Sequence, residues 1–288
     1  MVTIETVSAG IDWLTTTATD NLTAKLLLRE AEKITREESD RGFFPKPWRQ
    51  SGYAGVSCGR VQHGERYDSA IVRLSSDLAD LEWWRVYQIT ERATRIDVQV
   101  TFRPSITPNA FIKRIHRQLK QHYAGHRTHP KITTWSSSDG GLTVYLGARS
   151  SALYFRCYNK EAESGDVEYQ GCVRMEIEFK DCAIKPLIGF LFANLPTRDF
   201  AGKVVSSFAI EHGISGFPEV HPPPSFYEGQ RLVTDEDKSL TWLSTQVQPT
   251  VINLIRRGRL ADTIKALGLE IMFPDGLHTQ HDWTKWSN

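Results

Sequence analysis

The stretch LYFRCYNKE, at residues 153–161, decides the fold. It has the alternation of a β-strand, in which successive side chains point to opposite faces. One face is apolar and can be buried, whereas the other carries two phenols and two cations, Tyr154, Arg156, Tyr158 and Lys160. A cation beside a tyrosine favours the phenolate and neutralises charge that develops on phosphorus, so this face suits phosphoryl transfer. The alternative interpretation is an edge strand whose solvated face happens to hold these residues.

Two further stretches, TRIDVQVTF (94–102) and CVRMEIEFK (172–180), have the same two-faced pattern. An antiparallel sheet can bury one face and leave the other in solvent. Helical periodicity is expected at 21–38, 109–123, 184–194 and 199–212. The sequence therefore predicts an α+β fold, with helices packed on a largely antiparallel sheet and a small helical C-terminal region.

The order of the remaining elements is also predicted from local pattern. A first strand is expected at 10–19, and a loop with Gly42, Pro45 and Pro47 follows the first helix. One hairpin is expected from 54–61 and 67–74, with Gly64 in its turn. The Pro-rich stretch 214–227 reads as a linker, which divides the chain into a catalytic domain (1–213) and a helical region (228–288).

Composition restricts the function less than the strands do. The chain has 288 residues and a formal net charge of +1, so a nucleic-acid binder would have to gather its cations into a patch. The four cysteines form no CxxC pair and are expected to be buried free thiols of a reducing cytoplasm. With neither a long apolar run nor a signal-peptide pattern, the sequence predicts a soluble protein.

Acidic residues in the middle of predicted strands indicate a metal site. Asp97 lies on one strand, and Glu176 and Glu178 lie on another. If the polar faces of the three strands coincide, these acids surround Tyr158 with the hard oxygen ligands that suit Mg²⁺ or Mn²⁺. Such an ion polarises a phosphodiester for attack by Tyr158, and Lys160 is expected to favour the phenolate.

Four pieces, in order, resemble the replication initiation factor family (Rep_trans) of rolling-circle plasmids and filamentous phages: GIDWLTTT (10–17), RIDVQVTF (95–102), TVYLGARSSALYFRCYNKEAE (143–163) and VRMEIEFK (173–180). The resemblance implies a DNA nicking-joining endonuclease in which Tyr158, between Arg156 and Lys160, becomes joined to the 5′ phosphate. It also implies that Asp97 and Glu176 or Glu178 hold the metal. Family members often carry a further acid where this chain has Gln99 and Thr101.

The same resemblance implies the partners, which are origin DNA, single-stranded or cruciform at the nick site, and a host helicase and polymerase. A second nucleophile is needed to end a round, either a water or Tyr158 of the partner subunit. Further DNA contacts are expected from Arg174 and from the basic cluster Arg256, Arg257 and Arg259, although that cluster equally suits a helix C-terminus. Two other classes stay open, a non-catalytic DNA-binding regulator of replication and a topoisomerase or tyrosine recombinase.

Overall fold

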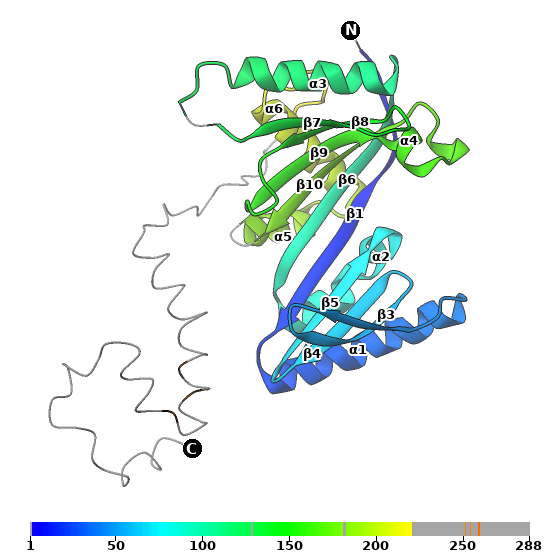
Figure 1. Ribbon diagram of the computed structural model, residues 1–288, viewed down its shortest axis with the longest axis vertical. Coiled ribbons are helices and arrows are strands. Elements are labelled where there is room, and N and C mark those ends of the chain that lie inside the picture. Colours follow the sequence, from blue (N-terminus) through cyan, green and yellow to red (C-terminus); the bar gives the residue numbers. More distant parts are fainter. Residues whose placement is uncertain are drawn as a thin grey trace, which may run out of the picture. The chain divides into compact units, whose positions relative to one another are not determined.

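The computed structural model describes residues 2–127, 129–180 and 183–220, together with Val251, Leu254 and Arg259. A ten-stranded sheet dominates this part of the chain, in the order β2-β3-β4-β5-β1-β6-β10-β9-β8-β7 (Figure 1). Every adjacent pair of strands is antiparallel. The predicted α+β class with a largely antiparallel sheet is therefore confirmed, whereas the predicted C-terminal helices lie outside the described residues.

The strands are β1 (Ile4–Ala18), β2 (Lys46–Gln50), β3 (Tyr53–Cys58), β4 (Val61–Arg66), β5 (Ser69–Ser75), β6 (Ala93–Pro104), β7 (Ile132–Ser136), β8 (Leu142–Leu146), β9 (Leu153–Asn159) and β10 (Val173–Lys180). The helices are α1 (Asn21–Asp40), α2 (Ser76–Thr90), α3 (Pro108–His122), α4 (Lys160–Ser164), α5 (Ile184–Ala193) and α6 (Thr197–Glu211). Long strands β1 and β6 connect the two halves of the sheet (Figure 1).

Helices α1, α2, α5 and α6 pack on the sheet over its apolar core. On β6, the alternate residues Ile96, Val98, Val100 and Phe102 are buried in the core. Helices α5 and α6 contact β6, α2 contacts β1, and α1 contacts β4 and β5. Helix α1 follows the same logic, because its buried residues Ala24, Leu27, Ala31 and Ile34 form one stripe. The predicted site residues of β6, β9 and β10 lie on the opposite, polar face of the sheet.

Strand register brings the three predicted polar faces together. Strand β10 lies between β6 and β9, with Glu178 opposite Asp97 on one side and Arg174 opposite Tyr158 on the other. Residues paired across an antiparallel ladder share a face of the sheet. The condition set by the sequence, that the acids and the tyrosine lie on one face, is therefore met.

Two local predictions are wrong. The single hairpin expected from 54–61 and 67–74 is instead three strands, β3, β4 and β5, and Gly64 lies inside β4 rather than in a turn. The loop expected around Pro47 contains strand β2. The second error has a physical cause: β2 is the edge strand, where proline is tolerated because its nitrogen need not donate to a neighbour.

The chain separates into two compact units, Met1–Gly229 and Gln230–Asn288. Cys58, Cys157 and Cys172 are buried free thiols in the first unit, and Cys182 lies outside the described residues. Within the described segments, no helix has both the length and the apolar character needed to cross a membrane.

Candidate active site

Tyr158 and Glu176 form the centre of the polar face. Tyr158 is partly exposed near the end of β9, and its phenol donates a hydrogen bond to Glu176 Oε1 at 2.5 Å. Glu176 is 2% exposed in the middle of β10. The two residues meet because Tyr158 pairs with Arg174, two positions from Glu176 along β10, so the phenol crosses diagonally to the carboxylate.

Two guanidinium groups flank this pair. Arg156 binds the second carboxylate oxygen of Glu176 through Nε and Nη2, and its Cζ lies 5.7 Å from the centroid of the Tyr158 ring. Arg174, directly opposite Tyr158, donates through Nε to Thr101 Oγ1 at 2.7 Å and lies 3.6 Å from Asp12 Oδ1. The tyrosine therefore has a cation on its own strand and another on the neighbouring strand.

Burial keeps the proton on the phenol. The pKa of Tyr158 is raised, first by burial and then by the negative charge of Glu176, while Arg174 acts in the opposite direction. Burial also raises the pKa of Glu176, against the lowering effect of Arg156. The phenol is thus neutral before substrate binds, with a carboxylate in position to take its proton.

Lys160 does not occupy the place that strand alternation predicted. Strand β9 ends at Asn159, whose side chain accepts a hydrogen bond from the backbone N–H of Ala162, and Lys160 begins helix α4. Its Nζ lies 2.5 Å from Glu163 Oε2 and 5.1 Å from the centroid of the Tyr169 ring. The N-cap signal of Asn159 explains the change from strand to helix.

The two tyrosines of β9 differ in accessibility. Tyr154 is 8% exposed and stacks on Tyr145, with 5.8 Å between the ring centroids. Its pKa is also raised by burial. Because Tyr158 is the more accessible of the two and contacts Glu176, the geometry agrees with the choice of Tyr158 as nucleophile.

A second pair of carboxylates, those of Asp97 and Glu178, is bound by Arg95. Arg95 donates to both oxygens of Asp97, at 2.7 and 2.5 Å, and its Nη2 lies 3.0 Å from Glu178 Oε2. Glu178 also pairs with Lys180. Asp97 is 2% exposed, and burial raises its pKa to about 6, even though Arg95 favours the charged form.

The oxygen donors on this face suit a hard divalent cation, but cationic side chains hold them all. Among the described residues, no three acids, histidines or cysteines are close enough together to hold a metal ion. The structure therefore places Asp97, Glu176 and Glu178 on one face without gathering them into one set of ligands. These donors fit Mg²⁺ or Mn²⁺ chemically, provided that Arg95 and Arg156 give up their carboxylates.

No site role was assigned to Arg95 or to Asp12 from the sequence. Both signals were present, since Arg95 lies two residues before Asp97 on the same strand face and Asp12 lies on the predicted first strand. Of the expected basic cluster, Arg256 and Arg257 lie outside the described residues, and Arg259 is exposed in the second unit.

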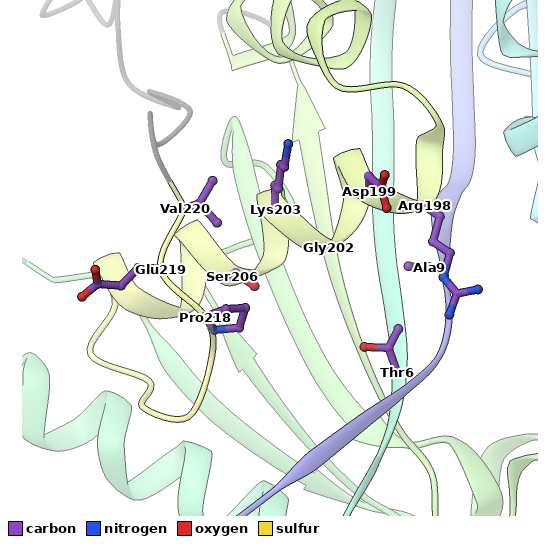
Figure 2. A pocket seen from close by; sticks show the side chains of 10 residues that line it. All are labelled: Thr6, Ala9, Arg198, Asp199, Gly202, Lys203, Ser206, Pro218, Glu219 and Val220. Atoms are coloured by element: carbon purple, nitrogen blue, oxygen red, sulfur yellow. The ribbon is translucent and has the colours of Figure 1, made fainter.

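A hollow of about 490 Å³ lies elsewhere, between β1, α6 and residues 218–220 (Figure 2). Charges of both signs line it, from Arg198, Asp199, Lys203 and Glu219. Helix α6 covers the apolar side of the sheet, so this pocket is separate from Tyr158 and contains none of the predicted site residues.

Comparison with known proteins gives a family match and a match to solved structures. The family model described as "Replication initiation factor" matches residues 91–209. A rolling circle replication initiator protein from Geobacillus stearothermophilus has 18% sequence identity, with 78% of this chain and 91% of that chain covered and a TM-score of 0.48. The comparison with curated proteins gives no match. The resemblance predicted from the sequence is thus confirmed: residues 91–209, which contain Asp97, Tyr158 and Glu176, match the replication initiation factor family.

Proposed function

We propose that this chain initiates rolling-circle DNA replication by nicking and rejoining origin DNA through Tyr158. The family match supports a role in replication initiation. The observation that carries the chemistry is the hydrogen bond from Tyr158 to Glu176, with Arg156 and Arg174 on either side. A nucleophile, an adjacent base and cations for the phosphate are the components that a covalent phosphoryl transfer needs.

In the proposed step, Tyr158 Oη attacks the phosphorus and the phenol proton passes to Glu176. A bond forms between the phenolic oxygen and the phosphorus, and the bond from phosphorus to the 3′ oxygen breaks. The 3′ oxygen takes a proton from water, and the 5′ phosphate stays on the enzyme. Arg156 and Arg174 stabilise the charge on the phosphoryl oxygens. Because the pKa of Tyr158 is raised, the phenol is neutral before the reaction, and its proton is transferred during the attack.

We propose Asp97 and Glu178 as ligands of Mg²⁺ or Mn²⁺, with Glu176 beside them. When bound, such an ion polarises the phosphodiester. In its absence Arg95 keeps Asp97 and Glu178 in position on the polar face. Glu176, predicted from the sequence as a ligand, is engaged by Tyr158 and Arg156, so its first role in this proposal is to accept the proton.

The proposed partners follow from the nick. The protein acts on origin DNA in the cytoplasm, and a host helicase and polymerase extend the released 3′ end. The sequence contains no Walker-type phosphate loop, so it offers no evident means of unwinding DNA itself. A second copy of the chain would supply another Tyr158 to end the round.

Trapping of the covalent product tests this proposal. Purified protein is incubated with a single-stranded origin oligonucleotide, and the adduct is mapped by mass spectrometry. Tyr158→Phe should bind DNA and form no adduct, whereas Tyr154→Phe, a matched change on the same strand, should keep substantial nicking. An adduct on Tyr154, or on any residue outside 153–161, would overturn the assignment. A regulator without catalytic activity, the main alternative, would bind origin DNA and form no adduct in any variant.

A further inference from the structure

The polar face of β2–β5 has a composition unlike the face around Tyr158. Cross-strand pairs place Lys46, Ser57, Gln62 and Arg73 in one row, and Thr15 continues that row to Arg95 on β6. A neighbouring row holds Trp48, Gly55, Gly64 and Ile71. No strand residue on this side of β2–β5 is acidic, because Glu65 points to the other face. We name this surface, from β2 to β5, the N-terminal platform.

Three cations of the platform have no acidic partner. Lys46, Arg66 and Arg73 make no ion pair with any described residue, in contrast to the arginines around Tyr158. Burial, and then the nearby charge of Arg95 on β6, lower the pKa of Arg73. The platform is the segregated basic patch that a chain of net charge +1 needs for binding a polyanion.

Aromatic rings lie under these arginines. The Cζ of Arg73 is 5.0 Å from the ring centroid of Trp48, and that of Arg66 is 5.1 Å from the ring centroid of Tyr53. The Trp48 ring lies over Gly64, where an added Cβ would come within 3.0 Å of it. Arginine planes and aromatic rings together are the groups on which unpaired bases stack.

The platform is continuous with the candidate active site. Thr15 links Arg73 to Arg95, and Arg95, whose Cζ is 5.1 Å from the Trp13 ring centroid, holds Asp97. Four strand spacings separate β9 from β5, which corresponds to about 19 Å at ~4.8 Å per spacing. Along the strands, the row of Tyr158 reaches β6 at Thr101 and the row of Arg73 reaches it at Arg95, which adds about 20 Å at ~3.3 Å per residue. A strand bound at Tyr158 could therefore extend across the same sheet.

We infer that the N-terminal platform binds single-stranded DNA that flanks the nick site. The inference rests on the proposed function for the source of the strand, while the binding itself depends on platform residues outside the matched segment 91–209. Bases exposed in a single strand can stack on the platform, and its three cations contact phosphates. A duplex hides its base faces and uses only the cations, so the platform should favour single strands.

Two double variants of the full chain test the inference. Lys46→Gln/Arg66→Gln removes two exposed platform cations, and Arg29→Gln/Arg49→Gln removes two exposed cations from α1 and the other face of β2. Both lower the net charge by two, so a general charge effect cancels between them. Each double variant is made in a Tyr158→Phe background, and anisotropy of a fluorescent single-stranded oligonucleotide is measured from 50 to 200 mM salt.

The platform variant should bind more weakly and lose about 1.4 from the slope of log affinity against log salt, because each lost single-strand phosphate contact contributes about 0.7. The control variant should match its parent. Equal effects from the two variants, or equal competition by a blunt duplex of the same length, would overturn the inference. Adduct formation is measured separately with the chain that retains Tyr158. If that chain forms no adduct while the platform variant still binds single strands more weakly, the result counts against the proposed function but supports the inference about the platform.

Discussion

Asp97 allows a quantitative test of the electrostatics of the candidate site. Two effects oppose each other there, since burial favours the neutral acid while Arg95 favours the carboxylate. Burial is the larger, and it raises the pKa of Asp97 from 3.8 to about 6. Below pH ~4 the folded and the unfolded chain both hold the proton. As the pH rises through 6, the folded protein loses a stabilisation of about 3 kcal/mol, from ~1.4 kcal/mol per pKa unit.

The perturbation is Asp97→Asn, which keeps the size of the side chain and removes its titration. Wild type should lose about 2 to 3 kcal/mol of unfolding free energy relative to the variant between pH 4 and pH 7. The difference between the two proteins is the informative quantity. Burial lowers the pKa of His212 to about 4, so its contribution to stability rises with pH over the same range, and it cancels in the difference.

Urea denaturation at unit steps of pH gives both free energies. Asp68→Asn, at an exposed turn position, is the control and should stay within about 0.5 kcal/mol of wild type throughout. A difference between wild type and Asp97→Asn that does not change with pH would refute the reasoning. The opposite slope would show that Arg95 outweighs burial and that Asp97 is a carboxylate at every pH tested.

Three further predictions concern activity. Glu176→Gln should still bind origin DNA, but its nicking rate should be about 10²- to 10⁴-fold lower. Wild-type activity should rise with pH as Glu176 loses its proton, and this rise should be absent from the variant. Single-turnover nicking rates measured across pH check both expectations. Asp97→Asn should abolish nicking while the fold survives, and excess chelator should do the same to wild type; full nicking in either case would exclude the metal proposal. A chain ending near Glu219 should still cleave a single-stranded origin oligonucleotide, and a folded but inert product would show that the predicted division into a catalytic domain and a C-terminal region is wrong.

Alternation predicted most of the site because it depends on only a few neighbouring residues. The polar faces of β6, β9 and β10 follow from their sequences, and their register then brings Tyr158 next to Glu176. Alternation also put Arg95 on that face, two residues from Asp97, but it did not show that the two side chains bind each other. That pairing, which the structure shows, competes with metal binding.

Errors arose where a local signal changed the type of element. Asn159 caps α4, which takes Lys160 out of the strand that periodicity had extended to it. Gly64 was interpreted as a turn residue, yet it lies inside β4. The ring of Trp48 packs against this position, where a side chain would crowd it. In both places a contact distant in sequence, or a single cap, outweighed the propensity of the residue.

Charge divides the polar face into two parts with different roles. Around Tyr158, five ion pairs join the four acids Asp12, Asp97, Glu176 and Glu178 to the four cations Arg95, Arg156, Arg174 and Lys180, so their formal charges cancel. The platform has cations without acids. Since charges are screened beyond about 8 Å at physiological salt, an approaching DNA strand responds to the nearest part of the surface rather than to the net charge of the chain. First contact should therefore occur on the platform. The arginines around Tyr158 become available to phosphate only when the strand arrives and competes for them with their carboxylates.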